Sequence, residues 1–482
     1  MSDRPNIVMF MPDQLRADSV GAFGNPVVQT PNIDALARRG TIFRNAFSQH
    51  SLCGPSRVSM FTGWYPHVGG HRTLTNLLKP WEPNLLKSLK ESGYNVAWVG
   101  QRGDTFAPGV TEASTDFAGW IVRPEFGFEP CPFPEGHKLR YSFYHGRRKH
   151  DGVVLDFDEA TVQSAENWIA AGPPEPWVLF AALIFPHPPF EVEEPWFSLH
   201  SRKDIPPRAP SMLDDKPRYM RAMYDRYELA RLDEDDFSEI RATYYGMISR
   251  VDDQLGRVMR AVDRAGFGAR TVTAFFTDHG EYAGDFGLVE KWPAGVSECL
   301  VRNPLVIAGP GLREGQVSDE MVELIDLTPT MMELGEVAPK YTQFGMSLAP
   351  LLRGEVGVHR ARAFSEGGYL TIEEHQFERA RFPYDRKSAI MHEEPITMGR
   401  AVALRDRKWT YIYRLYEPPE LYDRENDPLE VTNLAGRPEY AELERKSRDQ
   451  ILAWLCETSD VIPWEEDPRF PRLEQRPIRK ET

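Results

Sequence analysis

Four short runs of apolar residues stand out along the chain, and none of them alternates between apolar and polar positions. They cover residues 6–11, 94–99, 177–185 and 271–276. Continuous apolar character predicts strands that are buried on both faces, as in a parallel sheet that lies between two layers of helices.

Helical patterns separate these runs. Residues 31–39 begin with a proline start signal, and residues 83–93 end on a glycine stop. Between residues 240 and 262, apolar side chains recur at spacings of three and four, which marks one buried helix face. Strands that alternate with helices predict an α/β fold with a mainly parallel central sheet.

The pattern changes near residue 360, so we predict a large α/β domain over residues 1–360 and a smaller α+β subdomain over residues 361–482. Residues 401–413 are typical of an antiparallel hairpin that turns at Asp-Arg-Lys, and an amphipathic helix follows near residues 443–455. Residues 186–236 are rich in proline and charge and have little periodicity, which predicts a long surface excursion.

Charge narrows the classes of partner. The chain has 57 lysines and arginines against 72 aspartates and glutamates, which gives a net charge of −15. Nucleic-acid binding and docking on anionic membranes both use basic surfaces, so we expect neither kind of partner. A local group of cationic side chains can still bind a small anion inside a cleft.

The cysteines and the N-terminal segment indicate in which cellular compartment we expect the protein. The cysteines Cys53, Cys131, Cys299 and Cys456 are far apart and form no C-x-x-C pair. The sequence starts with a strand-like run, without a basic segment followed by an apolar one, and no apolar stretch reaches membrane-spanning length. We therefore expect a cytoplasmic protein with reduced thiols.

Two of the predicted strands end in polar residues that can bind a metal. Asp13 and Gln14 follow the first strand, and Asp278 and His279 follow the fourth. Since ligands bind beyond the carboxyl ends of parallel strands, these side chains could form an oxygen-rich site suited to Ca²⁺, Mg²⁺ or Mn²⁺ more than to Zn²⁺. Taken singly, each fragment is better explained by a helix cap or a turn.

His187 and Lys291 are candidates for proton transfer and anion binding. His187 ends the third strand with prolines on both sides, so it is either a general acid or a packed loop residue. Lys291 could contact an anion, although a solvated surface lysine is the ordinary outcome. Both alternatives stay open at this point.

One short motif carries a resemblance to a known family. Cys53-Gly-Pro-Ser-Arg57 resembles the C-x-P-S-R signature of the type I, formylglycine-dependent sulfatases of the alkaline phosphatase superfamily. Segments 6–14, 30–34, 276–280, 421–428 and 432–435 resemble further motifs of that family. The resemblance implies an alkaline-phosphatase-like fold, in which helices flank a mixed, mostly parallel sheet and a smaller C-terminal subdomain follows.

The resemblance also implies the chemistry of the site. Cys53 would be oxidised to formylglycine by a formylglycine-generating enzyme, and the hydrated aldehyde would be the nucleophile. The implied catalytic residues are Cys53, Arg57, His187 and Lys291. The implied ligands of one divalent metal, with calcium expected and manganese as the alternative, are Asp13, Gln14, Cys53, Asp278 and His279.

Two features favour the branch that contains phosphonate monoester hydrolases and related arylsulfatases. Gln14 stands where many sulfatases have a second aspartate. Residues 71–76 resemble a segment of the phosphonate hydrolases whose asparagine lies in the active site, which implies that Asn76 contacts the substrate.

The segment after the second strand departs from the common sulfatase pattern. Gln101 and Gly103 occupy the positions of a lysine and a histidine in many sulfatases. We expect Gln101 and Thr105 to contact the substrate. The group that deprotonates the hydrated aldehyde stays open among Arg102, Asp104 and Thr105.

The expected function is hydrolysis of small anionic sulfate esters, aryl sulfates in particular, through a covalent sulfated hemiacetal. A phosphonate monoester or phosphodiester hydrolase with the same site is the first alternative. Two other classes remain: a binding protein in which Cys53 is never matured, and a phosphotransferase in which Cys53 itself attacks. We expect a homo-oligomer, either a dimer or a tetramer.

Overall fold

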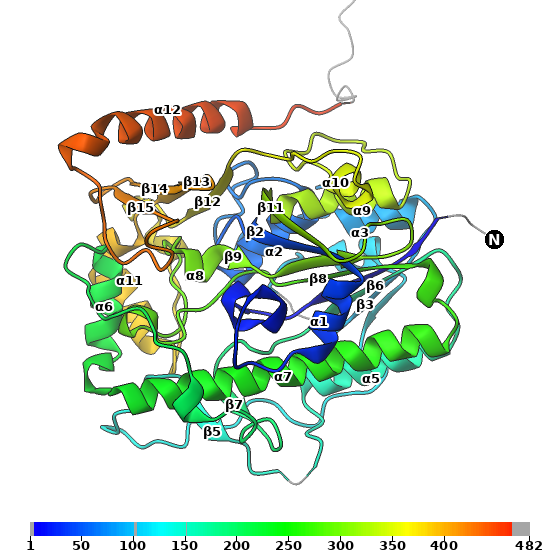
Figure 1. Ribbon diagram of the computed structural model, residues 1–482, viewed down its shortest axis with the longest axis horizontal. Coiled ribbons are helices and arrows are strands. Elements are labelled where there is room, and N and C mark those ends of the chain that lie inside the picture. Colours follow the sequence, from blue (N-terminus) through cyan, green and yellow to red (C-terminus); the bar gives the residue numbers. More distant parts are fainter. Residues whose placement is uncertain (1–3, 101–103, 151, 465–482) are drawn as a thin grey trace, which may run out of the picture.

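A nine-stranded sheet forms the centre of this computed structural model, which describes residues 4–100, 104–150 and 152–464 (Figure 1). The order along its main path is β11-β2-β10-β8-β1-β6-β3-β4, and β9 pairs with β2. The strands are β1 (Asn6–Met11), β2 (Gly40–Phe47), β3 (Asn95–Val99), β4 (Phe117–Gly119), β6 (Trp177–Ala182), β8 (Thr271–Phe276), β9 (Arg302–Asn303), β10 (Leu305–Ala308) and β11 (Gln316–Glu323).

The middle of the sheet is parallel and fully buried. β1 runs parallel to β6 and β8, with Ile7 opposite Val178 on one side and Val272 on the other. β10 runs antiparallel to both β8 and β2, so the sheet is mixed but mostly parallel. The α/β class and the four predicted strands are confirmed, although the third ends at Ala182 and not at residue 185.

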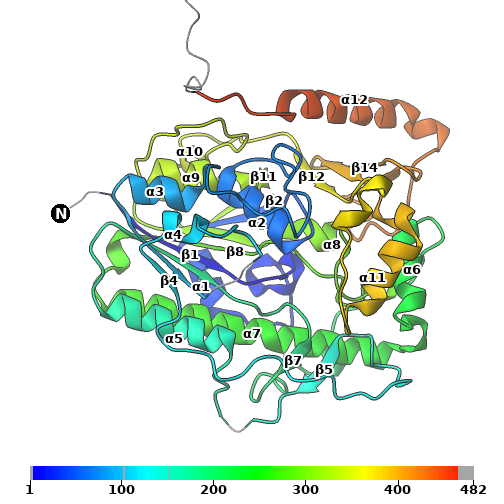
Figure 2. The same cartoon turned by 180° about the vertical axis from the view of Figure 1, so that it is seen from behind.

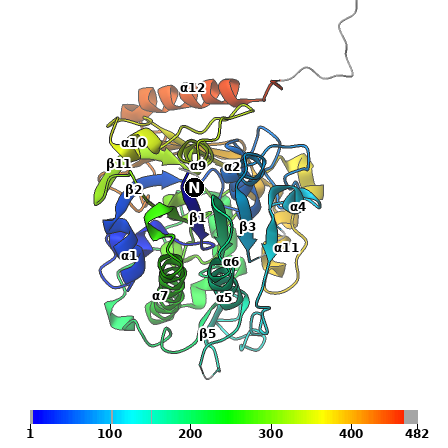
Figure 3. The same cartoon turned by 90° about the vertical axis from the view of Figure 1, so that its right-hand side faces the viewer.

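Helices cover both faces of this sheet (Figures 1 and 3). One layer contains α1 (Pro31–Arg38), α5 (Phe157–Ala170) and α7 (Glu234–Arg264). The other contains α2 (Cys53–Thr62), α3 (Leu85–Glu91), α4 (Val110–Ser114), α9 (Leu327–Leu334) and α10 (Ala349–Arg353). The helices predicted over residues 31–39, 83–93 and 240–262 are confirmed within a few residues at their ends.

The longest of these helices, α7, follows its sequence pattern closely. Its apolar positions Ile248, Val251 and Leu255 are fully buried. Asp233 caps its first turn by accepting a hydrogen bond from the backbone N–H of Asp236. Across the part of the chain that the structure describes, neither α7 nor any other helix combines the length and apolar character that a membrane span requires.

Residues 186–236 are only partly the surface excursion that the sequence predicts. They contain β7 (Phe190–Val192), which pairs with β5 (Tyr144–Arg147), and α6 (Arg218–Arg226). Tyr219 and Met223 of α6 are buried. The prediction is wrong for α6 because it packs against segments far along the chain, Trp292 on Tyr219 and the helix at residues 385–393, which local periodicity does not reveal.

A second, antiparallel sheet lies in the C-terminal part of the chain. Its strands, in spatial order, are β12 (Ala363–Gly367), β13 (Ala401–Arg405), β14 (Trp409–Arg414) and β15 (Glu420–Asp423). The hairpin and the C-terminal helix are confirmed by β13–β14 and by α12 (Ala441–Thr458). Other helices of this half of the chain are α8 (Glu298–Val301) and α11 (Asp385–Glu393), which packs on α6 (Figure 2). The boundary at residue 360 stays a prediction.

Trp454 attaches α12 to the rest of the molecule. Its ring is 4.9 Å from that of Tyr65 and 4.8 Å from that of His67, both on the chain that follows α2. It also stacks on Phe364 of β12 at 4.7 Å. The segment that follows α2 and a strand of the second sheet therefore meet on one indole.

Replacing this indole should destabilise the protein. We expect Trp454→Ala to lower the free energy of unfolding by about 3–5 kcal/mol, because a buried aromatic contact is lost and a cavity remains. Leu452 lies on the same helix and is 60% exposed, so Leu452→Ala should cost less than about 0.5 kcal/mol. Urea unfolding of both variants measures the difference, and equal losses would show that α12 is not anchored by Trp454.

Candidate active site and metal centre

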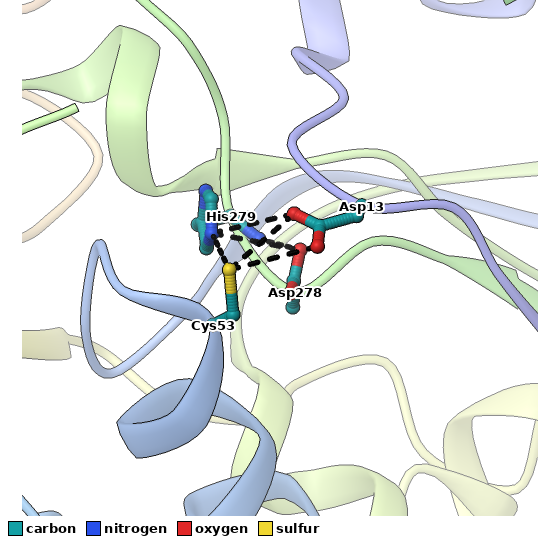
Figure 4. Close-up of side chains that lie close together, drawn as sticks. All are labelled: Asp13, Cys53, Asp278 and His279. Atoms are coloured by element: carbon teal, nitrogen blue, oxygen red, sulfur yellow. Dashed lines mark hydrogen bonds and ion pairs between the residues drawn. The ribbon is translucent and has the colours of Figure 1, made fainter. Parts of the chain in front are cut away.

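Cys53, the first residue of α2, lies against the ends of two neighbouring strands (Figure 4). Asp13 follows β1, while Asp278 and His279 follow β8. The sulfur of Cys53 is 3.6 Å from each carboxylate oxygen of Asp13 and 3.2 Å from Nε2 of His279. One ligand atom from each of the four residues lies within 4.8 Å of the others. The structure thus brings together four of the five predicted metal ligands.

The guanidinium of Arg57 fixes the two carboxylates. It is fully buried, and it donates through Nη2 to Oδ2 of Asp13 at 2.8 Å and through Nε to Oδ2 of Asp278 at 2.9 Å. Burial alone would lower the pKa of Arg57, but the carboxylates around it raise this pKa above its usual range. Oδ1 of each aspartate remains directed toward Nε2 of His279, at 3.6 and 3.8 Å.

His279 presents a ring lone pair to this cluster. Its Nδ1 donates to the carbonyl of Gly280 at 3.0 Å, which leaves Nε2 facing Cys53. Burial lowers the pKa of His279 despite the opposing effect of Asp278, so the ring is neutral near pH 7. A neutral imidazole whose other nitrogen donates to a carbonyl is the usual form of a histidine metal ligand.

The beginning of α2 is held close to the strand ends. The hydroxyl of Ser56 donates to the carbonyl of Asp278 at 2.6 Å. A Cβ at Gly54 would lie 2.6 Å from the carbonyl oxygen of Asp104, so this close approach requires glycine. Residue 53 is thereby placed at a helix N-terminus, where the helix dipole favours negative charge.

Gln14 lies beside this cluster, and its amide faces a second group of buried side chains. Oε1 of Gln14 accepts a hydrogen bond from Nζ of Lys291. Its Nε2 donates to Glu281 and to Glu290, in the second case at 3.1 Å. An aspartate at this position would face two carboxylates with like charge, which gives a physical reason for the amide. Metal ligation by Gln14 stays a prediction.

Glu281 and Glu290 are site residues that the sequence did not predict, although each is close in sequence to a predicted site residue. Both side chains are buried. Burial and the charge of Glu290 raise the pKa of Glu281 to about 7. Burial would also raise the pKa of Glu290, but the charges of Lys291 and Lys387 lower it to about 2. No sequence pattern indicates that carboxylates at these two positions are buried.

Lys291 is buried, whereas most lysines lie on the protein surface in contact with solvent. Only 4% of it is exposed, and its Nζ lies 3.5 Å from Oε1 of Glu290. Burial alone would lower the pKa of Lys291, but Cys53 and Glu290 raise it above its usual range. The ammonium therefore stays charged in the interior, beside the predicted ligand Gln14. Its catalytic role stays a prediction.

His187 lies on the chain that follows β6 and is partly buried. Its Nδ1 donates to the carbonyl of Pro188 at 2.6 Å. The backbone N–H of Asp13 donates to the carbonyl of Phe185 at 3.3 Å, so this turn lies next to the metal-ligand segment. The hydrogen bond from Nδ1 to Pro188 restricts the orientation of the ring. Whether His187 is an acid stays a prediction.

Asn76 ties together its own loop. Its amide donates to the carbonyl of Gly70 at 2.8 Å and to that of Gly69 at 3.3 Å. These contacts do not join it to Cys53, and the substrate contact of Asn76 stays a prediction.

Asp104 is connected to the site by a hydrogen bond with Arg57. Oδ1 of Asp104 accepts from Nη1 of Arg57 at 3.1 Å and lies 3.5 Å from the hydroxyl of Thr105, which is buried. Gln101 and the candidate base Arg102 fall outside the described residues. Substrate contacts by Gln101 and Thr105 stay predictions.

The donor set fits a hard divalent cation. Asp13 and Asp278 supply two carboxylates, His279 supplies a neutral ring nitrogen, and residue 53 supplies the fourth position. Arg57 offsets one of the two negative charges, so the cluster retains net negative charge for a cation. The carboxylate oxygens suit Ca²⁺ or Mn²⁺, whereas an unmodified cysteine sulfur at position 53 would suit softer metals, so the fit to a hard cation requires an oxygen at that position.

Two family profiles match the chain. The sulfatase family matches residues 5–337, a range that includes every predicted site residue. The family described as N-sulphoglucosamine sulphohydrolase, C-terminal, matches residues 284–455. The two matches overlap at residues 284–337 and together extend from the first strand into α12.

Proteins of known name align over most of the chain. It is 28% identical to the multifunctional alkaline phosphatase superfamily protein PehA of Trinickia caryophylli, over 95% of the chain and 96% of that protein. Identity to arylsulfatase K of Xenopus laevis is 26%, over 93% and 82%. The crystal structure of the phosphonate monoester hydrolase of Agrobacterium radiobacter superposes with a TM-score of 0.74 at 24% identity, over 94% and 96%. The predicted alkaline-phosphatase-like fold is confirmed.

The aspartates of the cluster should control metal affinity. We expect Asp278→Asn to raise the dissociation constant for Ca²⁺ or Mn²⁺ by more than about 100-fold, because a ligand charge is lost. Asp104→Asn is the matched control, since Asp104 contacts Arg57 but does not belong to the four-residue cluster. Calorimetric titration with each metal measures both variants. Similar affinities for Asp278→Asn and the wild type would exclude the metal centre.

Proposed function

The chain belongs to the sulfatase family, and on this premise we propose that it hydrolyses sulfate esters, with aryl sulfates as substrates, through a formylglycine formed from Cys53. One observation carries the proposal. Cys53 is buried at the N-terminus of α2, with its sulfur within 3.6 Å of Asp13 and 3.2 Å of His279. A cysteine that served packing alone would not require two carboxylates and a neutral imidazole around it.

The proposed cofactors are formylglycine 53 and one divalent metal, Ca²⁺ first and Mn²⁺ as the alternative. A formylglycine-generating enzyme would carry out the maturation. Once hydrated, the aldehyde supplies one hydroxyl for attack and a second whose deprotonation releases the transferred group. A bound metal supplies a lower hydroxyl pKa at that position. Asp13, Asp278 and His279 would hold the metal, and we retain Gln14 as a further ligand.

The cationic side chains of the site bind and orient the ester group. Arg57 stays charged and holds the carboxylates of Asp13 and Asp278 beside residue 53. Lys291 brings a second charge beside Gln14, where it stabilises negative charge on the sulfate oxygens. Asn76, Gln101 and Thr105 are the proposed substrate contacts.

His187 is proposed to donate a proton to the leaving oxygen. Its Nδ1–H is already given to the carbonyl of Pro188. The protonated ring therefore offers Nε2–H to the ester, and the neutral ring retains the orientation needed to be protonated again. A positioned acid of this kind contributes about 10²- to 10⁴-fold to a rate.

A phosphonate monoester or phosphodiester hydrolase is the second candidate. The specific observation in its favour is Gln14, held by Glu281 and Glu290, where many sulfatases are expected to have an aspartate. The relative PehA is described as multifunctional, and one structural neighbour is a phosphonate monoester hydrolase. Both candidates use the same residues, so the substrate comparison decides between them.

Matured protein tests the proposal directly. We expect the peptide that contains Cys53 to be about 18 Da lighter than the thiol form after co-expression with a formylglycine-generating enzyme. We expect kcat/KM for 4-nitrophenyl sulfate to exceed that for an aryl phosphonate monoester, and Cys53→Ala to abolish both activities. Mass spectrometry and steady-state kinetics measure these outcomes.

Three results would contradict the proposal in different ways. A preference for the phosphonate by orders of magnitude would select the second candidate. An intact thiol with no turnover, despite the maturation enzyme, would select a binding protein. An intact thiol with phosphoryl transfer would select a phosphotransferase that uses Cys53 itself.

The leaving group should reveal the role of His187. For His187→Gln, we expect the loss of kcat to grow along a series of aryl sulfates as the pKa of the phenol rises, reaching about 10²- to 10⁴-fold. A good leaving group requires little protonation, so its loss should be small. The same loss on every ester would show that His187 is a packed loop residue.

A further inference from the structure

A buried carboxylate, Glu290, lies between two buried ammonium groups. Its Oε1 is 3.5 Å from Nζ of Lys291 and 3.7 Å from Nζ of Lys387. Its Oε2 accepts a hydrogen bond from Nε2 of Gln14 at 3.1 Å. Lys387 belongs to α11, in the chain between β12 and β13, and its side chain is 3% exposed.

The chain between β12 and β13 also contacts the two residues that follow Lys291. Nε1 of Trp292, which is fully buried, donates to the carbonyl of Thr397 at 2.8 Å. The backbone N–H of Gly368 donates to the carbonyl of Pro293 at 2.8 Å. Trp292 and Pro293 are therefore both hydrogen-bonded to the chain between β12 and β13, which carries Lys387. This attachment gives Lys387 a defined position relative to Lys291.

The ammonium of Lys291 has two competing acceptors. One is Oε1 of Gln14, beside the metal cluster, and the other is Oε1 of Glu290. The attraction of Glu290 depends on how much of its charge another cation offsets, because these groups interact in a desolvated interior. Lys387 is a second lysine that reaches the same oxygen, at 3.7 Å.

We infer that Lys387 is a positioning residue for Lys291: by sharing the charge of Glu290, it leaves the Lys291 ammonium directed toward Gln14 and the transferred ester group. This inference rests on the proposed function, in which Lys291 binds that group. It assigns a part in catalysis to α11, which lies in the C-terminal part of the chain and outside the segment matched by the sulfatase profile.

Lys387 also pairs with Glu378, at 3.3 Å, and this contact offers a control. If Lys387 only stabilised the chain between β12 and β13, its ion pair with Glu378 would account for its burial. The two roles differ in one respect: only positioning depends on the charge of Glu290. A comparison of charge removal at Glu378 and at Glu290 therefore separates them.

The test uses the matured, metal-loaded full chain and the variant Lys387→Met/Glu378→Gln, which removes both partners of that ion pair and leaves no new buried charge at Glu378. We expect kcat/KM to fall about 10- to 100-fold, because a displaced catalytic group of this kind costs that much. Glu378→Gln alone should stay within about 3-fold of the wild type, and so should Lys387→Arg, which keeps the charge.

Adding Glu290→Gln to the double variant is the decisive step. We expect kcat/KM to return to within about 3-fold of Glu378→Gln, since Lys291 no longer faces an uncompensated carboxylate. Inorganic sulfate, titrated by calorimetry, should bind more weakly to Lys387→Met/Glu378→Gln and regain affinity with Glu290→Gln. Circular dichroism and the thermal midpoint establish that each variant is folded.

The inference would be overturned if adding Glu290→Gln lowered kcat/KM further. It would also be overturned if kcat/KM and sulfate affinity of Lys387→Met/Glu378→Gln equalled those of the wild type. An unfolded double variant would also overturn it, since Lys387 would then be needed for the fold. The substrate preference of the wild type tests the proposed function separately from this inference. If the wild type prefers the phosphonate monoester, the kcat/KM of each variant relative to the wild type is measured on that substrate.

Discussion

The site depends on one buried cation, the guanidinium of Arg57, which lies between Asp13 and Asp278. It has no exposed surface and uses one oxygen of each carboxylate. Without it, two desolvated carboxylates would repel each other at the ends of adjacent strands. With it, their remaining oxygens face His279 and residue 53. A single helix turn thus connects α2 to β1 and β8 and defines the fourth ligand position.

Much of this arrangement follows from sequence rules. Asp13 and Asp278 come directly after continuous apolar runs, so the strand-end rule places them together, and the motif around Cys53 supplies the helix that meets them. The rest depends on contacts between distant segments. Glu281 and Glu290 are polar residues with no periodic signal, and their burial follows from the amide of Gln14 and the two lysines. Likewise, α6 is covered by Trp292 and by α11, which its own sequence does not indicate.

The C-terminal part of the chain contributes more than a cover over the main sheet. Trp454 packs on Tyr65 and His67, in the segment that follows the helix of Cys53. Trp292 donates to Thr397 next to Lys291, and Lys387 reaches Glu290. These contacts join the C-terminal part of the chain to the segments that follow α2 and β8. The segment that contains Lys291 is therefore attached to the chain between β12 and β13.

The central claim is that residue 53 completes a cation site built from the ends of β1 and β8. Anomalous diffraction from crystals of the matured protein grown with Mn²⁺ tests it most directly. The account predicts one strong anomalous peak within coordination distance of Asp13, Asp278, His279 and residue 53. Mn²⁺ bound elsewhere, with the ammonium of Lys291 or ordered water alone among those four side chains, would contradict it.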